Sequence, residues 1–123
     1  MKRGLWVAWW FCLAVWTAAL TTTAPVHIYQ AILPEGLWSL PVSKILHVSA
    51  YAFLTAFAMG LRPPSVWRWL ILLFLLEHGV VTEWIQAFVP ERGSSVNDIV
   101  IDHCGVALGM ALTWPWRSRG VGL

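Results

Sequence analysis

Four apolar runs, each about as long as a membrane-spanning helix, dominate this sequence of 123 residues. A helix needs about 20 predominantly apolar residues to cross a bilayer core about 30 Å thick. Charged residues make up only 11% of the chain, whereas a solvated globular domain carries about 25%. The sequence therefore predicts an all-α integral membrane protein, a four-helix bundle that forms one domain over residues 1–123 and has the lipid bilayer, not nucleic acid, as its partner.

Prolines and capping residues indicate where the predicted spans begin and end. We expect spans at about residues 4–24, 44–61, 66–88 and 95–114. Pro25 would end the first span, and Ser43 would cap the second. Ser95 followed by Asp98 fits a capping box at the start of the fourth. The connection at 26–42 mixes turn formers with apolar residues, and we expect it to lie as a loop against the membrane surface.

The first apolar run also resembles a cleaved signal peptide, because Lys2 and Arg3 precede it. The run from Gly4 to Ala24 is longer than the usual apolar segment of a signal peptide. The best small-residue cleavage site would place Pro25 directly after the cut. We therefore expect the first run to be retained as a span.

The distribution of basic residues predicts the orientation. Cytoplasmic connections carry an excess of Lys and Arg. Six basic residues fall on one side of the predicted topology, and two, Lys44 and Arg92, on the other; the six are Lys2, Arg3, Arg62, Arg68, Arg117 and Arg119. We therefore expect both termini in the cytoplasm and the connections at 26–43 and 89–94 facing outward.

Polar side chains of three predicted spans gather at one depth in the outer half of the membrane. Helical spacing places Lys44, His47 and Tyr51 on one face of the second span, Glu83 and Gln86 near the outer end of the third, and Asp98 and Asp102 in the first two turns of the fourth. An ionised carboxylate that faces lipid costs about 3 kcal/mol. We expect these groups to point into the bundle, with Arg92 in the short outer turn covering them.

Two glycines continue the acidic face of the fourth span. Asp98, Asp102, Gly105 and Gly109 lie at i, i+4, i+7 and i+11, which is one stripe of a helix. Glycines four residues apart let a second helix approach closely. The stripe therefore predicts close helix packing below the acids.

This pattern resembles the VanZ-like family of small bacterial membrane proteins, whose founding member is associated with teicoplanin resistance. The family's first motif, an Asp-Lys followed by His and an aromatic residue, corresponds here to Ser43, Lys44, His47 and Tyr51. Its second motif, which runs Glu, Gln, Pro, Arg, Asp, Asn and Gly, corresponds to Glu83, Gln86, Pro90, Arg92, Asp98, Asp102, Gly105 and Gly109. Together the motifs cover about residues 43–112.

The sequence departs from the family pattern at two positions. Ser43 replaces the usual Asp, and Asp102 stands where Asn is usual. The number of acidic residues in the polar layer is thus unchanged, but one of them lies at a different position. We expect Asp102 to compensate for Ser43. The resemblance implies a multi-pass protein of the bacterial inner membrane linked to the cell envelope, and it implies no established reaction.

The first functional hypothesis is a site that binds or modulates a cell-envelope amphiphile, with a possible influence on glycopeptide sensitivity. The candidates are a lipid-linked cell-wall intermediate and a lipoglycopeptide. Lys44 and Arg92 would bind phosphate or carboxylate, and Gln86 and Tyr51 would bind hydroxyls or amides. The alternative is that these residues have only a structural role, as an ion-pair network that fixes helix register. Asp98 would then be a capping residue and Lys44 a snorkelling anchor.

The second hypothesis is a membrane-embedded enzyme that acts on such a substrate. His47 would serve as acid or base, Glu83 or Asp102 as its partner, and Arg92 would stabilise negative charge. Ser94 and Ser95 lie near, but no sequence feature activates them as nucleophiles. The third hypothesis is a small proton-coupled exporter, which the lack of any charge from residue 4 to residue 24 disfavours.

The remaining polar residues of the spans predict no cofactor. Glu77 and His78 point about 100° apart on a helix, so they cannot face one partner. We expect a neutral Glu77 hydrogen bonded to Thr17 or Thr55, with a proton relay as the alternative.

His103 and Cys104 are also neighbours and diverge in the same way. No third ligand lies at helical spacing from both, and His27 falls in the outer connection. We therefore expect no metal site.

Overall fold

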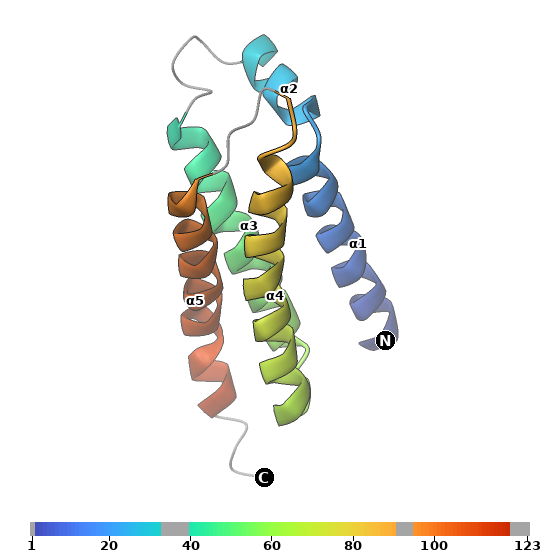
Figure 1. Ribbon diagram of the computed structural model, residues 1–123. Coiled ribbons are helices and arrows are strands. Elements are labelled where there is room, and N and C mark those ends of the chain that lie inside the picture. Colours follow the sequence, from blue (N-terminus) through green and yellow to red (C-terminus); the bar gives the residue numbers. More distant parts are fainter. Residues whose placement is uncertain (1, 33–39, 91–94, 119–123) are drawn as a thin grey trace.

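The computed structural model describes residues 2–32, 40–90 and 95–118, and every regular element in them is an α-helix. The helices are α1 (Lys2–Thr21), α2 (Ala24–Ile32), α3 (Leu40–Gly60), α4 (Ser65–Gln86) and α5 (Val96–Ser118). Figure 1 shows the four long helices side by side, with the short α2 at the end of the bundle opposite the start of α1. The start of α1 and the end of α5 lie at the same end. The predicted all-α bundle of four long helices is confirmed.

Three of the described helices are long and apolar enough to cross a membrane: α1, α4 and residues Val96–Pro115 of α5. The second predicted span corresponds to α3, which has 21 residues but is not among these three. It packs against α1, α4 and α5, most extensively against α5. Lys44 and His47 of α3 have their hydrogen-bond partners, Asp98 and Asp102, on α5. Which end of the bundle faces the cytoplasm stays a prediction.

The predicted connection at 26–42 is wrong in part. Residues Ala24–Ile32 form α2, and α3 already begins at Leu40. Pro25 and Pro41 each stand in the first turn of a helix, where a missing backbone N–H costs no hydrogen bond, so they begin helices here and do not exclude them. Ser43 consequently lies inside α3 and is not its cap. Residues 33–39 lie outside the described part of the chain.

The fourth helix also extends beyond its predicted end. α5 continues through Pro115 to Ser118, whereas the sequence predicted an end near Trp114. A proline removes one N–H donor from the helix and crowds one carbonyl of the preceding turn. Because α5 continues for only one further turn, it accommodates this single interruption.

The two glycines of α5 lie directly against the backbone of α3. A Cβ atom added at Gly105 would lie 2.7 Å from the carbonyl oxygen of Val48, and one at Gly109 would lie 2.6 Å from that of Ala52. Real Cβ atoms do not approach carbonyl oxygens so closely, so both positions require glycine. The α3–α5 contact is thus a backbone-to-backbone contact, of the kind that stabilises helix pairs in membranes.

The bundle has an apolar core toward the end where α1 begins, and the outer surface of the bundle is apolar as well. Trp9 is buried in this core and donates a hydrogen bond from Nε1 to the carbonyl oxygen of Leu54, at 2.8 Å. Large apolar side chains such as Phe11, Trp69 and Phe88 are more than half exposed. An apolar core under an apolar surface is the pattern expected of a protein surrounded by lipid.

Replacement of Gly109 by alanine tests the close contact of α3 and α5. The added methyl group forces the two backbones apart, so we expect Gly109→Ala to destabilise the protein by about 2 kcal/mol. Thermal unfolding of the detergent-purified protein measures this change. Gly4→Ala is the matched control, because a Cβ there meets nothing within 4 Å. Equal melting temperatures for Gly109→Ala and the wild type would contradict the packing described here.

Candidate functional site

Two pairs of charged or polar side chains join α3 to α5 above the glycine contact. Lys44 Nζ lies 2.5 Å from Asp98 Oδ1, and His47 Nδ1 lies 2.7 Å from Asp102 Oδ1. The partners are 54 and 55 residues apart along the sequence, a nearly constant offset. The two helices are therefore parallel and in register. They can be parallel because α4, which lies between them in the sequence, runs through the bundle in the opposite direction (Figure 1).

The two pairs differ in their exposure. The side chains of Lys44 and Asp98 are 29% and 16% exposed, whereas those of His47 and Asp102 are 5% and 1% exposed. The outer pair can therefore exchange partners with a group that arrives from outside the bundle. The inner pair is enclosed by protein, where a carboxylate is tolerated only if it is hydrogen bonded.

One oxygen of Asp102 is not hydrogen bonded. Its Oδ2 atom is buried and has no partner among the described residues. This oxygen faces α4 at Gly79, where an added Cβ would lie 3.3 Å from Oδ2 and 3.2 Å from the Cβ of Asp102. Buried polar atoms are nearly always paired, so an unpaired carboxyl oxygen requires an explanation.

A second polar chain links α3, α4 and α1 through His78. Tyr51 Oη lies 2.8 Å from His78 Nδ1, and Thr17 Oγ1 lies 2.8 Å from His78 Nε2. The Thr17 hydroxyl donates its one hydrogen to the carbonyl oxygen of Leu13, so it accepts from His78. A neutral His78 with its proton on Nε2, accepting the Tyr51 hydroxyl at Nδ1, satisfies all three contacts.

Trp16 fills the space between the two polar chains. Its ring meets those of His47 and Tyr51 edge to face, with centroid distances of 5.5 and 6.2 Å. Edge-to-face contacts fix the orientation of aromatic rings. Trp16 therefore helps to hold His47 against Asp102.

Glu83 fixes the start of α5, and this corrects the predicted capping box. The Ser95 backbone N–H donates to Glu83 Oε1 at 2.6 Å, while Ser95 Oγ accepts from the Asn97 N–H at 3.1 Å. The sequence predicted that Asp98 would accept the Ser95 N–H. The structure places Glu83 of α4 in that role, because Asp98 turns toward Lys44. Ser95 is thus engaged as a helix cap.

Glu83 nevertheless belongs to the same cluster as the α3–α5 pairs. It is only 2% exposed and lies close enough to interact electrostatically with His47, Asp98 and Asp102. The cluster of Lys44, His47, Tyr51, Glu83, Asp98 and Asp102 is called the polar cluster below. The sequence predicted that these residues would share one layer, and the structure brings them together.

Gln86, another predicted site residue, contacts α1 and is not hydrogen bonded to the polar cluster in the described part of the chain. Gln86 is buried and donates from Nε2 to the carbonyl oxygen of Leu20, at 3.0 Å. Carbonyls in the last turn of a helix lack partners within the helix, so Gln86 completes the end of α1. Arg92, the predicted cover of the site, and Ser94 lie outside the described residues.

Sequence reasoning missed the role of His78 and misplaced Glu77. Glu77 is exposed on α4, and the hydroxyl of Thr17 bonds with His78. Thr55 Oγ1, the other expected partner of Glu77, is buried without a partner. The buried positions Leu75, Gly79, Thr82 and Gln86 of α4 form a helical stripe that includes residue 78 and excludes residue 77. That stripe is the signal that could have identified His78.

The described residues contain no group of three or more His, Cys, Asp or Glu side chains that could hold a metal ion. His103 Nε2 lies 3.2 Å from the carbonyl oxygen of Leu76, and Cys104 is exposed. The ionisable groups of the polar cluster are carboxylates, an imidazole, an ammonium and a phenol group.

Apolar helices that enclose paired ionisable side chains define a multi-span integral membrane protein with an intramembrane polar site. The VanZ/LLP1 family matches residues 4–117, nearly the whole sequence, and the chain belongs to this family. The resemblance drawn from the motifs is thereby confirmed. No curated protein and no solved structure gives a significant match.

A double-mutant cycle tests the buried His47–Asp102 pair. Removal of one partner leaves the other buried and unpaired, so we expect His47→Ala to destabilise the protein by about 3 kcal/mol. The same substitution in the Asp102→Asn background should cost less by about 1 to 2 kcal/mol. Thermal unfolding in detergent gives both values, and Ser49→Ala on the exposed face of α3 is the neutral control. Strictly additive effects would show that the two side chains do not interact.

The neighbours Glu77 and His78 should respond oppositely to replacement by leucine. His78→Leu leaves the hydroxyls of Tyr51 and Thr17 without a shared partner, so we expect a loss of about 2 kcal/mol. Glu77→Leu removes a carboxyl group from a surface that faces lipid, and we expect equal or greater stability. The melting temperatures of the two variants, each compared with that of the wild type, test these expectations. A strongly destabilised Glu77→Leu would mean that Glu77 meets a partner that the single chain lacks.

Proposed function

We propose that the polar cluster binds the head group of a cell-envelope amphiphile from the outer leaflet of the bacterial inner membrane. The unpaired, buried Oδ2 of Asp102 is the observation that carries this proposal. A network that serves only to fix helix register needs no unpaired carboxyl oxygen, although Trp16 Nε1 and Thr55 Oγ1 are also buried without a partner in the described part of the chain. This one lacks a hydrogen-bond partner at its deepest carboxyl group, and a protonated Oδ2 would equally lack an acceptor.

The charges of the cluster indicate which ligand chemistry fits. The carboxyl oxygen of Asp102 accepts from hydroxyl, amide or ammonium groups. Lys44, partly exposed and paired with Asp98, offers an ammonium group to a phosphate or carboxylate. A ligand that has hydroxyl or amide groups next to an anionic group can bind Asp102 through the former and Lys44 through the latter. An amphiphile also carries a lipid tail. A lipid-linked cell-wall intermediate or a lipoglycopeptide has this chemistry.

Entry to Asp102 passes the contact between α4 and α5. Gly79 lies against the carboxyl group and has no side chain to obstruct it. A modest separation of the two helices at this point exposes Oδ2 to a donor from the ligand. Binding of such an amphiphile would link the protein to envelope assembly and to glycopeptide sensitivity, as the family resemblance implies.

Native mass spectrometry of the detergent-purified protein tests this proposal. Asp102→Asn replaces the accepting Oδ2 by a donating amide, so we expect retention of the amphiphile to fall about tenfold, the worth of one charge-assisted hydrogen bond. Glu77→Gln is the matched control, since it makes a similar change on the exposed face of α4. Its retained ligand should equal that of the wild type.

A second variant tests whether Asp102 compensates for Ser43. The double variant Ser43→Asp with Asp102→Asn restores the charge pattern usual in the family. We expect it to regain at least part of the retention that Asp102→Asn loses. Identical ligand spectra in the wild type, Asp102→Asn and Lys44→Gln would show that the polar cluster is structural only.

The second candidate function is an enzyme that acts on the same amphiphile. The 2.7 Å contact between His47 and Asp102 favours it, because a carboxylate that orients an imidazole is an arrangement used for general base catalysis. The Ser95 hydroxyl, however, caps α5 and has no contact that would activate it. If the protein is an enzyme, His47→Gln should keep the bound amphiphile but abolish its conversion in a time-course measured by mass spectrometry.

A further inference from the structure

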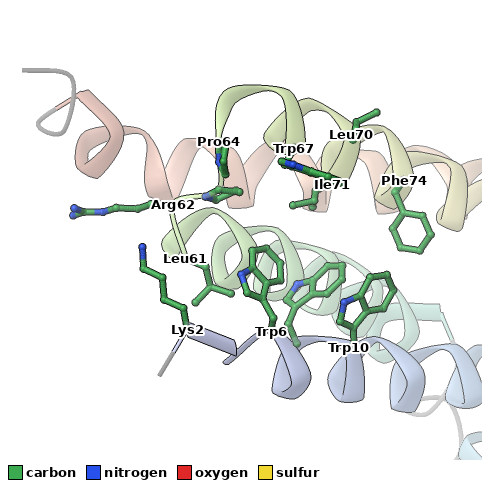
Figure 2. Close-up of a pocket in the computed structure, with 12 residues that line it drawn as sticks. Lys2, Trp6, Trp10, Leu61, Arg62, Pro64, Trp67, Leu70, Ile71 and Phe74 are labelled. Carbon is green, nitrogen blue, oxygen red and sulfur yellow. The ribbon is translucent and has the colours of Figure 1, made fainter. Parts of the chain in front are cut away.

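A cleft lies between α1 and α4 at the end of the bundle where α1 begins and α3 ends. It has a volume of about 540 Å³. Figure 2 shows Lys2 and Arg62 at one end of this cleft, and Trp10 and Phe74 at the other. The polar cluster lies near the start of α3, whereas the charged end of the cleft lies at the end of α3, and the cleft reaches from there along α1 and α4 to Phe74.

Aromatic rings of α1 line one side of the cleft, Phe74 of α4 lies on the other side, and the rings are fixed by contacts with one another. The ring centroids of Trp6 and Trp9 are 5.9 Å apart, those of Trp9 and Trp10 are 5.0 Å apart, and Trp10 and Phe74 are 5.9 Å apart. The hydrogen bond from Trp9 to Leu54 anchors this row to α3. A preformed apolar wall that runs along two spans suits a hydrocarbon chain.

The open end of the cleft is positively charged. Lys2 and Arg62 both line it and both are exposed. Of the described residues that line the cleft, none is acidic. The charge at this end therefore complements an anion, and an apolar wall with a cationic end complements an anionic amphiphile.

The backbone of Arg62 supports a role for its side chain. Arg62 has a φ of 53°, in the left-handed region that glycine adopts most readily. It follows the last turn of α3, and its N–H donates to the carbonyl oxygen of Met59 at 3.0 Å. Helices commonly end with glycine at such a position. An arginine here is strained, and strained residues concentrate at functional sites.

We propose that this cleft binds an anionic phospholipid, with its phosphate between Lys2 and Arg62 and one acyl chain along Trp6, Trp10 and Phe74. Basic pockets between membrane helices bind anionic head groups. Arg62 contacts the phosphate through two parallel N–H donors, and Lys2 adds a second positive charge. The site is independent of the polar cluster and of the ligand proposed for it.

Titration of the detergent-purified protein with two lipids tests this site. Dioleoylphosphatidylglycerol and dioleoylphosphatidylcholine share their acyl chains and differ in net charge. We expect native mass spectrometry to show about tenfold tighter binding of the phosphatidylglycerol, which corresponds to one charge-assisted contact. Equal affinities for the two lipids would overturn the proposal.

Arg62→Gly separates the charge of Arg62 from its structural role. Glycine relieves the strained backbone, so the melting temperature should stay the same or rise. The affinity for phosphatidylglycerol should fall about tenfold, while that for phosphatidylcholine should not change. Arg3→Gln is the matched control, since Arg3 is exposed beside Lys2 but does not line the cleft.

Two further outcomes decide between a defined site and diffuse attraction of lipid to a basic surface. Trp67→Ala removes part of the apolar wall, and we expect it to weaken binding of both lipids to a similar degree. If Arg3→Gln weakens phosphatidylglycerol binding as much as Arg62→Gly does, the attraction is diffuse and the proposed site is wrong.

Discussion

The close approach of α5 to α3 is the constraint on which the rest of the structure depends. At Gly105 and Gly109 the two backbones are so near that no side chain fits between them. Helices that touch at backbone distance and run parallel keep their register for several turns in either direction. The pairs Lys44–Asp98 and His47–Asp102 meet at hydrogen-bond distance because the glycines below them fix the separation and rotation of the two helices.

The other long helices are joined to this pair by single polar contacts. His78 links α4 to α3 and α1, Glu83 links α4 to the start of α5, and Gln86 links α4 to the end of α1. In lipid, burial of apolar surface contributes little to helix association, so packing and hydrogen bonds determine which helices meet. α4 carries all three of these contacts, and the hydrogen bond from Trp9 to Leu54 joins α1 directly to α3.

The sequence predicted the four long helices and which polar residues share a helix face, because both follow from local spacing. Lys44 and His47 lie at i and i+3, and Asp98 and Asp102 at i and i+4, so that each pair shares one face of its own helix whatever the rest of the chain does. The role of Glu83 could not be predicted in this way. Its contact with Ser95 depends on how the chain returns after Pro90, whereas the capping-box rule considers only residues within one helix.

The positions of the helix ends were less predictable for a related reason. Pro25 and Pro41 are equally compatible with the end of one helix and with the first turn of the next, and only the path of the chain decides between them. His78 was overlooked because its partners, Thr17 and Tyr51, lie on helices far away in the sequence. The stripe of small and polar residues around it on α4, with Gly79, Thr82 and Gln86, contained the information, but only for a bundle whose packing was already known.

The parallel pairing of α3 and α5 also has a consequence for membrane insertion. The chain is synthesised from its N-terminus, so α3 emerges from the ribosome well before α5. Lys44 and His47 must therefore leave water before Asp98 and Asp102 exist to pair with them. The pairing of Lys44 and His47 is thus completed only when α5, the second helix after α3, joins the bundle.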